Sequence, residues 1–99
     1  MSYLSAGMGL LPEEAGRMMR AVRRFHFATK QDSHPVVAFL HNAYSVAIMD
    51  ILRDLATDDE IRRMTGEDMP KLRREVLGEQ DKLQKKAEDL ARKFGIMTG

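Results

Sequence analysis

Apolar residues recur at helical spacing along nearly the whole chain, in segments separated by glycine, proline and helix-capping residues. No segment alternates apolar and polar residues as a strand does, and no Asn-Gly or Asp-Gly pair marks a hairpin turn. The pattern predicts a single all-α, four-helix bundle-like domain over residues 1–99. Its expected parts are an N-terminal arm at 1–11 and helices at about 12–30, 35–56, 58–65 and 69–94.

Helix-starting and helix-ending residues support these boundaries. Pro12 and Pro35 suit the first position of a helix, where the missing N–H would have no partner. Thr57 and Glu60 have the spacing of a capping box, in which each side chain bonds the other residue's backbone N–H. Gly66 can then end the short third helix in a left-handed conformation.

The second helix is unlike its neighbours because it is apolar around most of its circumference. Fifteen of the 22 residues from Pro35 to Ala56 are aliphatic, aromatic or methionine. Such a helix must be covered on several sides, and three further helices, one of them very short, do not obviously suffice. We therefore expect helix 35–56 to be central and to lie near the interface of a homo-oligomer, most simply a two-fold dimer. The alternative is a monomeric bundle with this helix at its centre.

The long C-terminal helix is amphipathic, with one narrow apolar stripe of the width seen in coiled coils. The residues expected in the apolar core or the interface come from this stripe and from the second helix. They are Phe39, Tyr44, Ile48, Ile51 and Leu55 of helix 35–56, and Leu83, Leu90 and Phe94 of the C-terminal helix.

Composition narrows the classes of function. Hydrophobic residues make up 43% of the chain, charged residues 31%, and the net charge is +1, so no overall field attracts nucleic acid or membrane. Cysteine is absent, which excludes disulfides, thiolate metal sites and cysteine nucleophiles. The first residues do not resemble a signal peptide, and the longest apolar run in helix 35–56 is only five residues. We expect a cytoplasmic protein that does not cross a membrane.

Several polar residues of helix 35–56 are candidates for a reactive site. His41, Tyr44 and Ser45 share one ridge and would line the pocket of a ligand-binding or catalytic bundle. Asp50 and Asp54 point away from that ridge, so they cannot complete a catalytic triad within the helix. We expect these aspartates to pair with arginines of the first or fourth helix.

The histidines do not predict a metal site. His34 and His41 are seven residues apart, or about 10.5 Å along a helix, which is too far for both to bind one zinc ion. No glycine-rich phosphate loop is present either. We therefore expect no metal and no cofactor.

Two segments carry basic residues that suggest nucleic-acid binding. Arg17, Arg20 and Arg24 of helix 12–30 lie away from its apolar face, and Phe27 points into that basic side. Because the whole chain is nearly neutral, a solvated face with Phe27 in an oligomer contact is the favoured interpretation.

The second basic segment, 58–77, resembles part of a helix-turn-helix. Its second helix would present Lys71, Arg73 and Arg74 to DNA. Arg62 stands where that motif usually has a small residue, and Glu67 where it has an apolar one. These departures weaken the resemblance.

The sequence is most consistent with a small helical association module, without evident catalytic activity. Its surfaces would serve self-assembly and the binding of a protein partner. The alternatives are a DNA-binding regulator that uses segment 58–77 or helix 12–30, and a ligand-binding or catalytic bundle around His41.

Overall fold

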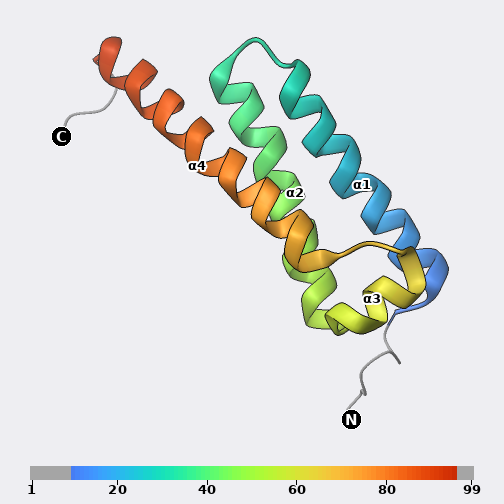
Figure 1. Ribbon diagram of the computed structural model, residues 1–99. Helices are drawn as coiled ribbons and strands as arrows, with labels where there is room; N and C mark the ends of the chain where they lie inside the picture. The colour runs from blue at the N-terminus through green and yellow to red at the C-terminus, as the bar shows by residue number, and fades with distance from the viewer. Residues whose placement is uncertain (1–9, 96–99) are drawn as a thin grey trace.

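The computed structural model describes residues 10–95 and contains four α-helices within them (Figure 1). They are α1 (Pro12–Gln31), α2 (Pro35–Leu55), α3 (Asp58–Thr65) and α4 (Met69–Lys93). The expected all-α class with four helices is confirmed. Compared with the expected ends, α1 is one residue longer, and α2 and α4 are each one residue shorter. The expected arm at 1–11 lies outside the described residues except for Leu10 and Leu11.

The local chemistry of the helix ends explains these boundaries. The capping box of α3 is present: the Glu60 N–H donates to the Thr57 hydroxyl at 3.1 Å, and the Thr57 N–H donates to the Glu60 carboxylate at 2.8 Å. Gly66 follows with a φ of 79°, a left-handed conformation that favours glycine. At the start of α2, the Val36 N–H donates to Nδ1 of His34 at 3.2 Å.

α2 lies between α1 and α4 and runs antiparallel to both (Figure 1). Hydrogen bonds fix this arrangement, because Ser45 of α2 bonds Val22 of α1, and Asn42 of α2 bonds Val76 of α4. The short α3 packs against α1 and α4. The expected central position of the second helix is therefore observed within the chain.

The apolar core gathers where the four helices meet, towards the C-terminal end of α2. Its largest fully buried apolar side chains come from every helix and are Val22, Met49, Leu52, Ile61, Met69 and Val76. α4 contributes its first half to this core and then extends beyond the α1–α2 hairpin (Figure 1). Leu83 is the last buried residue of its stripe, Leu90 is half-buried, and Phe94 is 68% exposed.

The buried face of α2 contains polar residues, and its exposed face is apolar, which is unlike an ordinary amphipathic helix. Its buried inner face includes Asn42 and Ser45, which have no exposed surface, as well as Met49 and Leu52. Its outer face is apolar and in contact with solvent. Within one chain, α1 and α4 therefore cover two sides of α2, and the third side is left open.

Candidate functional site

Asn42 is a buried polar link between three helices. Its Nδ2 donates to the Val76 carbonyl at 2.8 Å and to Oε1 of Gln80 at 2.9 Å, both in α4. Its Oδ1 lies 3.1 Å from Nδ1 of His26 in α1. Within the described residues, no buried side-chain N or O atom lacks a partner. Because a buried amide must be hydrogen-bonded, Asn42 fixes the register of α2 against both neighbours.

Ser45 forms a second link, towards α1 alone. Its hydroxyl donates to the main-chain carbonyl of Val22 at 2.8 Å, and the residue has no exposed surface. The small side chain lets the α1 backbone approach α2 closely. The hydroxyl is therefore a packing and bonding group, inaccessible to a ligand from solvent.

His41 sits at the edge of the α1–α2 interface beside two aromatic rings. Its Nδ1 lies 2.6 Å from Oδ2 of Asp32, in the connection between α1 and α2. The Phe25 ring lies 6.1 Å from the His41 ring and 5.2 Å from the Tyr44 ring, between ring centres. Both His41 and Asp32 are partly exposed.

The ridge of His41, Tyr44 and Ser45 does not converge on one cavity. Ser45 turns inwards to Val22, while Tyr44, about 100° further round the helix, is 49% exposed and contacts the Phe25 ring of α1. His41 finds its acidic partner in Asp32, which sequence reasoning did not consider. Asp32 lies outside any helix and nine positions before His41, so helical spacing gave no signal for the pair.

The outer face of α2 carries a row of exposed apolar side chains. We define the α2 outer face as Val37, Leu40, Tyr44, Ile51 and Leu55, each between 37% and 50% exposed. Ala47 is also exposed and lies within this row. Of the α2 residues expected in core or interface, Tyr44, Ile51 and Leu55 lie here, whereas Phe39 and Ile48 are half-buried.

The basic residues singled out from the sequence fall into two structural settings. Arg17, Arg20 and Arg24 are exposed along the outer side of α1, as is Phe27. Arg73 of α4, in contrast, donates to Asp50 of α2 at 2.6 Å. The expected pairing with an arginine of the first or fourth helix is thereby confirmed for Asp50, whereas Asp54 is exposed and has no ion pair among residues 10–95.

The segment that resembles a helix-turn-helix is tied to the rest of the protein. Ile61 and Leu72 are buried, as that motif requires. Glu67, after the turn glycine, forms a bidentate ion pair with Arg23 of α1. This hydrogen-bonded pair raises the pKa of the Arg23 guanidinium above its ordinary value. Lys71 and Arg74 are exposed at the start of α4.

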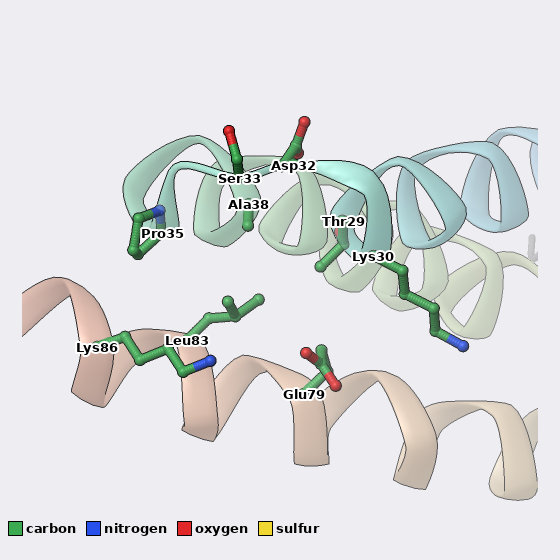
Figure 2. Close-up of a pocket in the computed structure, with 9 residues that line it drawn as sticks. All are labelled: Thr29, Lys30, Asp32, Ser33, Pro35, Ala38, Glu79, Leu83 and Lys86. Atoms are coloured by element: carbon green, nitrogen blue, oxygen red, sulfur yellow. The ribbon is translucent and has the colours of Figure 1, made fainter.

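A hollow of about 320 Å³ lies between the α1–α2 connection and α4 (Figure 2). Leu83 of α4 and Ala38 of α2 form its apolar part. Charged side chains of both signs line the remainder: Lys30, Asp32, Glu79 and Lys86. The mixture of charges does not select one class of ligand. Within residues 10–95, no group of three or more histidine or acidic side chains is placed to hold a metal ion.

By length and composition alone, α2 is apolar enough to cross a membrane. The same criterion is met by core helices that pack inside a protein. Comparisons of the chain with known protein families, with curated proteins and with solved structures found no match.

Proposed function

We propose that the protein is a small helical association module that forms a two-fold homodimer through the α2 outer face. The observation that carries this proposal is the row of half-exposed apolar side chains on a helix whose opposite face is already packed. From Val37 to Leu55 the row is about 27 Å long, because an α-helix rises about 1.5 Å per residue. Continuous exposed apolar surface of this kind marks interaction sites on proteins.

The spacing of the row favours a second copy of the same helix as its occupant. Val37, Tyr44 and Ile51 are seven residues apart, and Leu40 and Ala47 repeat between them, as in a coiled-coil seam. A two-fold axis brings the same surface of both copies together, so this row needs to be complementary only to itself.

An antiparallel pairing gives better packing than a parallel one. With the two-fold axis near residues 45 and 46, Tyr44 lies opposite Ala47 of the second copy, and Leu40 lies opposite Ile51. The large Tyr44 then meets the small Ala47, and Leu40 meets Ile51, which has the same volume, so the central layers fill space evenly. A parallel pairing in register would place Tyr44 against Tyr44 and Ala47 against Ala47, with crowding in one layer and a void in the next.

The C-terminal part of α4 supports a second contact. Leu90 and Phe94 continue the apolar stripe of α4 beyond the α1–α2 hairpin, and Phe94 is 68% exposed. In the dimer this projecting end would pack on the partner. The absence of cysteine fits a cytoplasmic location, and no catalytic role is part of the proposal.

The test compares the mass of the native chain with that of Leu40→Glu/Ile51→Glu, by size-exclusion chromatography with light scattering. Glutamate at these two positions places charge at the centre of the interface, so we expect a dimer for the native chain and an 11.3 kDa monomer for the variant. Phe27→Glu is the control, because Phe27 is an apolar residue on a different helix that is even more exposed than Leu40 and Ile51. It should remain dimeric.

Two results would overturn this proposal. One is a native chain that is monomeric at all concentrations. The other is a native chain that floats with phospholipid vesicles and needs detergent to stay in solution, which would make the α2 outer face a lipid-facing surface.

A further inference from the structure

The outer side of α1 is strongly basic although the whole chain is nearly neutral. Between Ala15 and Gln31, α1 has five arginine and lysine residues and no acidic residue. We define the α1 basic stripe as Arg17, Arg20, Arg24 and Phe27, which are separated by three, four and three residues. At about 100° per residue, these four residues share one face, opposite the buried Ala15, Met19 and Val22.

Among the residues that the structure describes, the arginines of this stripe are unpaired, as are Arg62, Arg63 and Arg74, whereas four other arginines are paired. Arg23, Arg53, Arg73 and Arg92 each form an ion pair with a carboxylate. Within residues 10–95, Arg17, Arg20 and Arg24 take part in no ion pair, although all three are exposed. Glu14, the nearest acid before them, is engaged in capping the Leu11 N–H at 2.9 Å. The charge of the stripe is therefore open to an external anion.

Phe27 adds an aromatic surface to this charge. It is 61% exposed, and with its basic neighbours it lines an open hollow of about 550 Å³. The other residues around this hollow are Arg20, Arg23, Arg24, His26 and Lys30. Phe25, two positions earlier, behaves differently, because it packs against Tyr44. An exposed ring framed by guanidinium groups is suited to a ligand that has both negative charge and flat aromatic faces.

We propose that the α1 basic stripe binds single-stranded nucleic acid, with a base stacked on Phe27 and phosphates on Arg17, Arg20 and Arg24. Arginine binds phosphate oxygens through two parallel N–H donors, and an aromatic ring accepts any base, so recognition would be largely independent of sequence. A polyanion without bases, such as a sulfated polysaccharide, would satisfy the charge but leave Phe27 unused. The proposal does not depend on self-association, because the stripe belongs to α1 and the α2 outer face to another helix.

The test measures binding of the full chain to a fluorescein-labelled thymidine oligonucleotide of about 20 nucleotides, by fluorescence anisotropy at low salt. Arg20→Glu/Arg24→Glu should weaken binding at least about tenfold, and the affinity of the native chain should fall steeply with added salt. The matched control is Lys82→Glu/Lys85→Glu, which changes the net charge equally on an exposed part of α4. It should weaken binding less than about twofold.

Phe27→Ala tests the stacking contact separately from charge. It should weaken binding about fivefold or more, and Phe27→Tyr should restore it, because tyrosine keeps the aromatic face. Circular dichroism and light scattering of each variant show whether fold and mass are kept.

Five results would overturn the proposal, four of them from the binding experiments. The first is the absence of binding at low salt, and the second is an equal loss of affinity in the α4 control. The third is an unchanged affinity in Phe27→Ala. The fourth is displacement of the oligonucleotide by heparin at equal charge, which would show that bases add nothing to binding. A change of mass in Phe27→Ala would also overturn it, because Phe27 would then be a self-association contact.

Discussion

Asn42 of α2 and Gln80 of α4 are joined by a 2.9 Å hydrogen bond although they are 38 residues apart in the sequence. The same amide group of Asn42 also holds the Val76 carbonyl, and its oxygen faces His26. One fully buried side chain therefore connects the three long helices. The opposite side of α2 remains open, and its exposed residues are mainly apolar.

Replacement of Asn42 should destabilise the protein clearly. Asn42→Ala leaves Gln80 and His26 without their buried partner, and we expect a loss of about 1–3 kcal/mol in the free energy of unfolding. Asn42→Asp should cost more, because a carboxylate cannot donate to the Val76 carbonyl and carries a buried charge. Urea denaturation followed by circular dichroism measures both. Gln84→Ala, at an exposed position of α4, is the control and should change stability by less than about 0.5 kcal/mol.

Ser45 should tolerate loss of its hydroxyl better than an increase in size. Ser45→Ala removes one hydrogen bond to the Val22 carbonyl, with an expected cost of about 0.5–1.5 kcal/mol. Ser45→Leu forces α1 and α2 apart and should cost about 1–3 kcal/mol or more. The same denaturation experiment compares the two variants. If Ser45→Leu were as stable as the native protein, α1 and α2 would not be in close contact at this point.

The contribution of the Arg23–Glu67 pair should not change across moderately alkaline pH. Hydrogen bonding to Glu67 raises the folded-state pKa of Arg23 above its ordinary value, so the stabilisation is complete below that ordinary value and is lost only as pH rises through the raised pKa. We expect Arg23→Gln to cost at most about 1 kcal/mol, because the Arg23 side chain is largely exposed. The cost, measured by thermal unfolding, should be the same at about pH 7 and about pH 10. The absence of a cost at either pH would show that the pair contributes no stability, and a cost lost by about pH 10 would show that a group other than Arg23 carries it.

The sequence predicted the helices well and the environment of α2 poorly, for a physical reason. Apolar spacing, Pro12, Pro35 and the Thr57–Glu60 capping box act locally, so helix ends can be inferred from neighbouring residues. The inner face of α2 depends on distant groups: only the fold shows that Val76 and Gln80 meet Asn42. Because α2 is apolar almost all round, its hydrophobic pattern does not identify which side is buried.

For the candidate sites as well, residue type alone does not predict which side chains are buried. Tyr44, Ile51 and Leu55 were selected because they are apolar, and they lie on the exposed side of α2. Ser45 was weighed as a reactive group because it is polar, and it is buried against α1. The charge and spacing of the α1 basic stripe are readable directly from the sequence. Helical spacing also places Phe27 on this basic side, and the structure shows that it is 61% exposed.

The absence of cysteine allows the proposed antiparallel pairing to be tested by cross-linking. In this pairing, Leu40 lies opposite Ile51 of the partner, so mixed Leu40→Cys and Ile51→Cys chains should form a disulfide on mild oxidation. Leu40→Cys alone should cross-link weakly, because its two copies lie far apart along the dimer. Strong cross-linking of Leu40→Cys alone and weak cross-linking of the mixed chains, on a non-reducing gel, would indicate parallel helices. Gln84→Cys, on an exposed part of α4, reports random collision.

The central claim is that the exposed apolar row of α2 is covered by a second copy of the chain. Sedimentation equilibrium of the unmodified protein over a range of concentrations tests it most directly, since dimerisation follows mass action. The account predicts a mass of twice 11.3 kDa that falls towards 11.3 kDa only on dilution. A single species of 11.3 kDa at every concentration, up to about 100 μM, would contradict it.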